Sequence, residues 1–280
     1  MPGRETRGDV TSDIRPTTKQ FYTPAPYSRL VRDGEVLVVG VGGLGCLWAL
    51  EAHSGCPDLA ELLLVDADES SFEGASYANC LFLDSGGEGR GAAALPSMAI
   101  HRLMDGMESI SDLLERAEVV ILMAGLGGGM GSGASGELAK MAKQFGSLVL
   151  SVVGLPFAEQ PLRCAIAEEA LPSLEAHSDV CIRVSMERLA WQSRRRKTNW
   201  MLGSGWIGEL VEGLVTTLAS VGRINLDLMD MRAIINKTGN ATLIVGTGSS
   251  ENPSSVVEMA RNSPLNLSLI HISEPTRRIL

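Results

Sequence analysis

Short apolar runs recur along the chain and alternate with longer segments of helical periodicity. Each run is rich in Val, Leu and Ile over about five residues, which is typical of strands buried on both faces of a sheet. Strands are expected at 35–39, 61–65, 79–83, 119–123, 148–153, 180–184 and 241–245. Because helical segments lie between them, the pattern predicts an α/β fold with a parallel, doubly wound, Rossmann-like sheet covered on both faces.

The segments between these runs carry the helical pattern. Helices are expected from the first glycine turn to about 54, at 97–115, from 137, at 165–176, at 203–221, after 225 and at 254–261. One helical stripe is interpreted as a core face rather than a binding stripe: Ile207, Leu210, Val211, Leu214, Val215 and Leu218. The basic run 194–197 is interpreted as a solvated loop rather than a phosphate or partner site.

Two glycine-dense turns each join an expected strand to an expected helix. The first spans 40–45 (GVGGLG) and the second spans 124–135 (AGLGGGMGSGAS). Glycine permits a close approach of the backbone, and the following helix offers free N–H groups and a positive dipole end. Both turns lie at the carboxyl edge of the predicted sheet, where ligands of such folds bind. We therefore predict one shared site that cradles phosphates.

Composition and charge narrow the class of protein. Hydrophobic residues make up 45% and charged residues 20%, as in soluble globular proteins, and no apolar run approaches the ~20 residues of a membrane span. The net charge of −9 argues against nucleic-acid binding through a basic field. The five cysteines include no CxxC pair, which favours a reducing compartment and no metal cluster. With no signal-peptide pattern, a cytoplasmic protein without membrane insertion is expected.

The two ends of the chain are not expected to belong to the fold. Residues 1–30 are polar, contain several prolines and show no periodicity, which predicts a disordered tail. Residues 267–277 (LSLIHISEPTR) resemble the translation of a sequencing-library transposon adapter. On this interpretation 267–280 is an artefact and the natural sequence is truncated after 266.

Taken in order, the motifs resemble the tubulin/FtsZ family over about residues 31–266. Residues 127–133 resemble its GGGTGTG signature, 40–45 resemble its first glycine loop, and 225–230 (NLDLMD) match its NxDxxD loop completely. Weaker matches lie at 66–68, 92–96, 156–157 and 263–265. The resemblance implies a GTP-binding Rossmann-like domain at 31–198, a central core helix at 199–222 and the start of a truncated α+β domain at 223–266.

The resemblance also implies a chemistry and a set of site residues. In the family, the glycine loops of one copy hold GTP with Mg²⁺, and the acidic loop of the next copy polarises the attacking water, leaving GDP. On this resemblance Asp227 and Asp230 are the catalytic pair, supplied in trans. The nucleotide contacts would be Gly42, Gly43, Gly45, Gly127, Gly128, Gly129, Gly131, Ser132, Gly133, Glu159, Arg163, Trp200 and Ser204, with no protein metal ligand.

The partners implied by the resemblance are further copies of the chain. Head-to-tail contacts that do not close into a ring give open filaments, so polymerisation would follow from a site shared between copies. Division-site adaptor proteins would bind a missing C-terminal tail. The implied task is cell division or a related cytoskeletal role.

Three departures from the family pattern remove polar groups near the nucleotide. Met130 stands where the family has Thr, Leu95 where it has Asn, and Met186 where it has Asn. A lost hydrogen bond to a charged phosphate costs ~1.5–3 kcal/mol, so weaker nucleotide binding is expected.

Two alternatives remain open at this point. A non-hydrolysing homologue that regulates or copolymerises with filaments is favoured by Met130 and opposed by the acids Asp227 and Asp230. An ATP-dependent adenylyltransferase of the ubiquitin-activating type is favoured by the resemblance of residues 36–68 to its nucleotide-binding start. The absence of any CxxC pair and the motifs of the second half oppose that alternative.

Overall fold

A computed structural model describes residues 35–83, 95–197, 201, 205–219, 228–235 and 252–261 of the chain. Several sequence predictions lie outside these residues. They are the tail 1–30, residues 92–94, the strand at 241–245, the segment 267–280, and the site residues Trp200, Ser204 and Asp227.

The described residues form one sheet of six strands in the order β3-β2-β1-β4-β5-β6. The strands are β1 (Val36–Val41), β2 (Glu61–Asp66), β3 (Asn79–Phe82), β4 (Val119–Gly125), β5 (Leu148–Leu155) and β6 (Val180–Ser185). Every neighbouring pair is parallel. The strands predicted within this part of the chain and the α/β doubly wound fold class are confirmed.

Strand β1 shows why the apolar runs are continuous rather than alternating. Val36 and Val38 pack into the hydrophobic cluster on one face of the sheet, whereas Leu37, Val39 and Val41 pack into the cluster on the other face. None of these side chains is more than 1% exposed. A strand in the middle of a parallel sheet is covered on both faces, so both sets of positions must be apolar.

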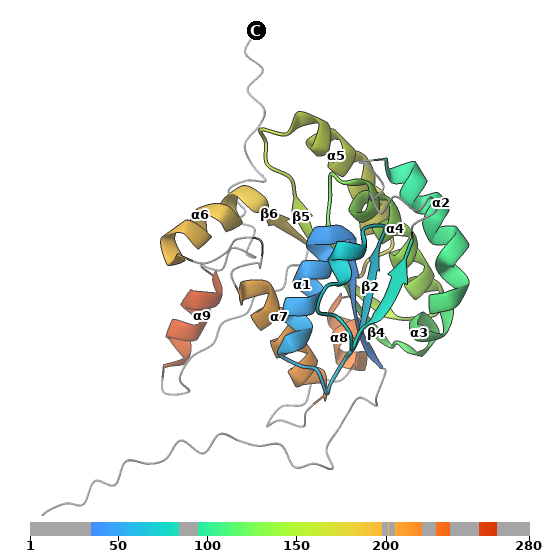
Figure 1. Cartoon of the computed structure of the whole chain (residues 1–280). Helices are drawn as coiled ribbons and strands as arrows, with labels where there is room; N and C mark the ends of the chain where they lie inside the picture. The colour runs from blue at the N-terminus through green and yellow to red at the C-terminus, as the bar shows by residue number, and fades with distance from the viewer. Residues whose placement is uncertain are drawn as a thin grey trace, which may run out of the picture.

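Helices cover both faces of the sheet. One face carries α1 (Gly42–Ser54), α6 (Met186–Arg196), α7 (Trp206–Ala219) and α8 (Leu228–Ile235). The other face carries α2 (Pro96–Gly106), α3 (Ser111–Arg116), α4 (Gly129–Gln144) and α5 (Pro161–Ala176). Figure 1 shows α1 beside α7, with α2, α4 and α5 gathered on the other side. Helix α9 (Pro253–Arg261) and the 3-10 helices η1 (Glu69–Phe72) and η2 (Met107–Ile110) complete the described elements.

The interpretation of the apolar stripe at 203–221 as core is confirmed. Ile207, Val211 and Val215 of α7 are fully buried, and Leu210 and Leu218 are nearly so. Helix α7 packs against α1 on the same face of the sheet. No helix among the residues described here is long and apolar enough to cross a bilayer.

Two helix predictions need correction. Helix α4 begins at Gly129 rather than at 137, because close packing of its glycines outweighs their poor helix propensity. The basic run is not a loop, because residues 194–196 form the end of α6 and Lys197 ends that helix in the left-handed conformation. A hydroxyl cap from Ser185 at the start of α6 and the buried Leu189 in its middle favour the helix there.

Candidate functional site

The two glycine turns meet at the carboxyl edge of the sheet, between β1 and β4. These strands are hydrogen-bonded neighbours, but β1 leads into α1 on one face and β4 leads into α4 on the other. Doubly wound sheets open a ligand crevice where the strand order reverses in this way. A pocket of about 470 Å³ lies at this point. A hollow of about 580 Å³ on α9 is lined by residues of that helix alone, so we place the candidate site at the sheet edge.

The pocket draws its lining from the ends of β1, β2, β4, β5 and β6. The lining residues are Gly42, Gly43, Leu44, Asp66, Asp68, Ser71, Gly125, Leu126, Gly128, Gly129, Met130, Gly131, Gly154, Pro156, Phe157, Gln160, Arg163, Met186 and Met201. Six sequence-predicted nucleotide contacts are among them: Gly42, Gly43, Gly128, Gly129, Gly131 and Arg163. Gly45, Gly127, Ser132, Gly133 and Glu159 are not.

Three helices direct their N-termini at this pocket. Helices α1, α4 and α5 start at or beside lining residues, and none of the three has a side-chain N-cap hydrogen bond or an acidic residue in its first turn. In α4 the amide of Ser132 bonds to the carbonyl of Gly128, and the first N–H groups of any α-helix lack an acceptor within the helix. The exposed guanidinium of Arg163 adds a positive charge. This arrangement suits a phosphate-bearing ligand.

Three of the motif glycines serve packing. A Cβ at Gly45 would overlap the carbonyl of Met123, and a Cβ at Gly131 would overlap the carbonyl of Gly125. A Cβ at Gly133 would overlap the carbonyl of Pro96, where α4 crosses the start of α2. These glycines let α1 and α4 approach β4 and let α2 approach α4, with or without a ligand.

Two other glycines have no such neighbour. A Cβ at Gly128 would meet no atom of the described residues within 4 Å, and Gly128 has an ordinary extended backbone with φ −106° and ψ 170°. A Cβ at Gly43 would meet only Ser71 Oγ at 3.7 Å and Asp66 Oδ2 at 3.9 Å. Both glycines line the pocket, so side chains there would fill the cradle. The space suits a ligand that approaches the backbone.

Ser132, beside the pocket, and Met130, on its wall, both take structural roles. The buried hydroxyl of Ser132 accepts a hydrogen bond from the amide of Gly127 at 2.8 Å, and Gly127 has φ +91°. This bond holds the turn in shape. Met130 is 4% exposed and packs in the apolar cluster of the α4 face. Where the family's Thr would offer a hydroxyl to the nucleotide, the side chain of Met130 instead packs in the core.

Asp66, Asp68 and Ser71 line the pocket, although they were not among the site residues predicted from the sequence. Asp66 is buried, and it accepts hydrogen bonds from Ser71 Oγ at 2.5 Å and from the amide of Ala67 at 2.7 Å. Burial raises the pKa of Asp66, while these hydrogen bonds act in the opposite direction. One signal was available: Asp66 is the last residue of β2 and Asp68 lies two residues later, and the carboxyl ends of parallel strands are where such folds bind ligands.

Of three further positions singled out in the sequence, one lines the pocket and two do not. Glu159 is exposed and does not line the pocket. Leu95 is 52% exposed and precedes α2. Met186, by contrast, is buried and lines the pocket with its apolar side chain.

The acidic residue Asp230 lies at the other edge of the sheet. It is exposed on α8, and its near neighbour Arg232 donates a hydrogen bond to the carbonyl of Gly146 at 2.7 Å. Gly146 precedes β5, so this contact is at the amino edge of the strands, whereas the glycine turns are at the carboxyl edge. The structure thus does not bring Asp230 together with the pocket of the same chain.

The described residues contain no group of three or more His, Cys, Asp or Glu side chains that could hold a metal ion. Mg²⁺ is commonly bound by one or two carboxylates together with substrate phosphates. Asp66 and Asp68 are two carboxylates on the wall of the pocket, and carboxylates are the side-chain ligands that a phosphate-bound Mg²⁺ uses.

Comparison with known proteins gives matches along most of the chain. FtsZ 2 of Haloferax volcanii, a cell division protein, is 31% identical over 250 residues, which cover 83% of this chain and 59% of that protein. FtsZ 1 of Pyrococcus furiosus, also a cell division protein, is 30% identical over 251 residues, which cover 85% of this chain and 68% of that protein. A solved FtsZ dimer of M. jannaschii superposes with a TM-score of 0.71 at 27% identity, covering 82% of this chain and 69% of that one.

The chain thus spans about 59% of the length of the first of these relatives. The adenylyltransferase alternative finds no support in these comparisons. The family model for the tubulin/FtsZ GTPase domain matches residues 35–192, the stretch that contains both glycine turns and all six strands. This chain belongs to the tubulin/FtsZ family.

Proposed function

We propose that this domain binds GTP in the pocket between β1 and β4, and that copies assemble head to tail to hydrolyse it. The observation that carries the proposal is the separation of the two halves of the site. The phosphate cradle is at the carboxyl edge of the sheet and the acid-bearing helix α8 is at the amino edge. A pocket at one end and an acid at the other can meet only between two copies stacked in the same direction.

Each part of the pocket has a role in holding the nucleotide. The amides at the starts of α1 and α4 bind the phosphates, and the open space at Gly43 and Gly128 lets them approach the backbone. Arg163 supplies a cation, and Asp66 and Asp68 face the side where Mg²⁺ would neutralise phosphate charge. The apolar wall formed by Phe157 and Met201 suits the base.

The chemistry requires little covalent help from the protein. Phosphoryl transfer depends mainly on positioning and charge stabilisation. Asp230, with Asp227 three residues earlier in the sequence, would enter the pocket of the next copy and orient the attacking water by accepting its hydrogen bonds. Hydrolysis would then occur only at a junction between copies.

The relatives support a cellular role without assigning it to this chain. The FtsZ proteins matched here are named for cell division, and one solved neighbour is a dimer. We propose a role for this chain in cell division or a related cytoskeletal task in the cytoplasm, with adaptor proteins as further partners.

A second candidate is a homologue that joins filaments without hydrolysing GTP. Met130 favours it, because its side chain belongs to the core and offers no hydroxyl to a phosphate. The two candidates differ in phosphate release rather than in assembly.

The test is GTP-dependent sedimentation with measured phosphate release, in the full-length protein that carries this sequence. The wild type is expected to pellet and release phosphate. Asp230→Ala is expected to bind GTP and pellet while phosphate release falls ~100-fold or more, because the acid positions water. Pelleting without release in the wild type would favour the second candidate. The absence of any GTP binding would refute the first candidate and likewise favour the second.

A further inference from the structure

Helix α8 is seated by one apolar stripe. Met231 is 5% exposed and belongs to the hydrophobic cluster on the sheet face that α1 and α7 cover. Leu228 and Ile235 are partly buried and pack against that cluster. The opposite face carries Met229, which is 71% exposed, and the exposed Asp230. Apolar contacts are not directional, so this stripe alone leaves the helix free to rotate or slide by a fraction of a turn.

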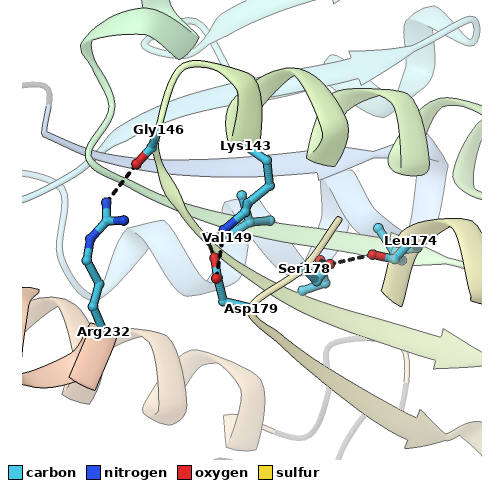
Figure 2. Close-up of polar contacts among 8 residues, drawn as sticks. Lys143, Gly146, Val149, Leu174, Ser178, Asp179 and Arg232 are labelled. Atoms are coloured by element: carbon cyan, nitrogen blue, oxygen red, sulfur yellow. Dashed lines mark hydrogen bonds and ion pairs between the residues drawn. The ribbon is translucent and has the colours of Figure 1, made fainter. Parts of the chain in front are cut away.

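Arg232 supplies a directional contact that the stripe lacks. Its Nη2 donates to the carbonyl oxygen of Gly146 at 2.7 Å (Figure 2). Gly146 has φ +91° and follows the last turn of α4, and its amide bonds back to the carbonyl of Lys143. The end of a helix carries a partial negative charge on its free carbonyls, which attracts a guanidinium.

The end of α4 that carries the carbonyl of Gly146 is itself held by polar contacts. Lys143 Nζ pairs with Asp179 Oδ1 at 2.7 Å, and Asp179 Oδ2 accepts from the amide of Val149 at 2.8 Å (Figure 2). Asp179 is the residue before β6 and Val149 is the second residue of β5. The end of α4 is therefore tied to the starts of two strands, and α8 is tied to that end.

The same helix reaches the phosphate cradle. Helix α4 runs for 16 residues from Gly129 in the pocket to Gln144, which corresponds to about 24 Å at 1.5 Å per residue. One end of α4 forms the pocket that a copy offers, and the other end holds the acid-bearing helix that the same copy offers to its neighbour.

We propose that Arg232 is a positioning residue for hydrolysis in trans. By bonding the end of α4, Arg232 fixes the height and rotation of α8, and so aims Asp230 at the pocket of the next copy. This inference rests on the proposed function. The inference adds that the position of the Asp230 carboxylate depends on the hydrogen bond from Arg232 to Gly146 and not on the apolar stripe alone.

The first test separates binding from catalysis. Arg232→Ala is expected to keep the GTP affinity within about twofold, because the pocket is a helix length away, while kcat at saturating GTP falls ~10–100-fold, as for an acid misplaced by about 1 Å. Arg232→Lys keeps a cation that can reach the carbonyl and is expected to recover part of kcat. Arg116→Ala is the matched control, since Arg116 contacts Asp112 and Glu61 in the described part of the chain, and this variant is expected to leave kcat unchanged.

The second test mixes two damaged copies and guards against simple misfolding. Gly128→Val should fill the cradle but leave α8 intact, whereas Arg232→Ala leaves the cradle intact. Of the four pairings at a junction, one joins an intact pocket to an intact α8, so an equal mixture is expected to recover about a quarter of the wild-type rate. Recovery shows that Arg232→Ala has a folded, working pocket.

The outcomes are distinguishable. If the wild type neither assembles nor releases phosphate with GTP, the proposed function fails. If the wild type is active and Arg232→Ala keeps full kcat, the positioning role is wrong. If Arg232→Ala is inactive and the mixture recovers nothing, Arg232 is needed for folding or assembly and the inference is likewise overturned.

Discussion

At the carboxyl edge of the sheet the candidate site is made mainly of backbone, whereas at the amino edge the acid-bearing helix is held by side chains. The carboxyl edge offers helix N-termini and glycines, with Ser132 bonding the turn from within. The amino edge relies on Arg232, Lys143 and Asp179. Backbone geometry is insensitive to most substitutions, except at glycine. A side-chain contact is lost when either of its residues is substituted, so substitutions should affect the two edges in different ways.

The largest expected effect breaks the carboxyl edge through its packing. Gly131→Ala places a Cβ against the carbonyl of Gly125 and is expected to lower the free energy of unfolding by about 3 kcal/mol, since backbone must move. Denaturant titration measures the loss. Gly128→Ala is the control and should change the free energy of unfolding by less than about 1 kcal/mol, because no atom lies near its Cβ. Equal losses in the two variants would show that the packing role is misassigned.

The next effect separates the cradle from the fold. Gly128→Val is expected to weaken GTP binding by about 100-fold, or about 2.7 kcal/mol, while the unfolding midpoint stays close to that of the wild type. The extended backbone at Gly128 accepts a β-branched side chain, which then occupies the cradle. Calorimetric titration with GTP, beside a thermal melt, gives both quantities. Undiminished affinity would place the phosphates elsewhere.

A smaller effect is expected at the hydroxyl that holds the second turn. Ser132→Ala leaves the amide of Gly127 without its acceptor and is expected to cost about 1–2 kcal/mol of folding free energy. Ser132→Thr keeps the hydroxyl and should recover most of that loss. Chemical denaturation of the three proteins decides the point, and a stable Ser132→Ala protein would mean that the turn holds its shape without the bond.

The smallest expected effect is a pH dependence at the contact between α1 and α7. Burial raises the pKa of Glu51 to about 7, and one carboxylate oxygen of Glu51 has no hydrogen-bond partner in the part of the chain that the structure describes. A carboxyl whose pKa is higher in the folded state binds a proton more readily when folded, so its contribution is favourable at low pH and is lost as pH rises from about 4.5 to about 7.

Glu51→Gln should therefore raise stability at pH 8 by up to about 1 kcal/mol, after allowing for solvent screening, and flatten the pH profile in that window. Melting temperatures measured from pH 4.5 to pH 8 provide the check. A wild-type profile that is already flat would contradict the assignment.

The strands β1, β2, β4 and β5 were predictable because their residues are mostly apolar and buried on both faces. The edge strands β3 and β6 were predictable from shorter apolar stretches, since β3 is largely exposed and β6 alternates. The start of α4 was not, because glycine propensity opposes a helix at 129–136 and only contacts with β4 and α2 reveal why the helix forms. The end of α6 was missed for a related reason, since charge composition alone does not distinguish a solvated helix from a loop.

Within the site, the glycine motif predicted where the pocket lies, but it did not distinguish the glycines needed for packing from those that leave space for a ligand. Asp66 and Ser71 reach the pocket because β2 pairs with β1, and such lateral pairing between distant segments is not written in any local pattern. The in-trans assignment of Asp230 stays a prediction, as does that of Asp227, which lies outside the described residues. Trp200 and Ser204 are outside them as well.

Some motif glycines are needed for packing and others leave space for a ligand, so the two groups should be retained differently as such sequences evolve. A descendant that abandoned nucleotide binding would still need Gly45, Gly131 and Gly133 to keep its helices against its sheet. It would be free to fill the positions of Gly43 and Gly128, where side chains meet open space. A search that weights every glycine of the signature equally would score a dead pocket almost as highly as a working one. The two open positions carry the information about activity.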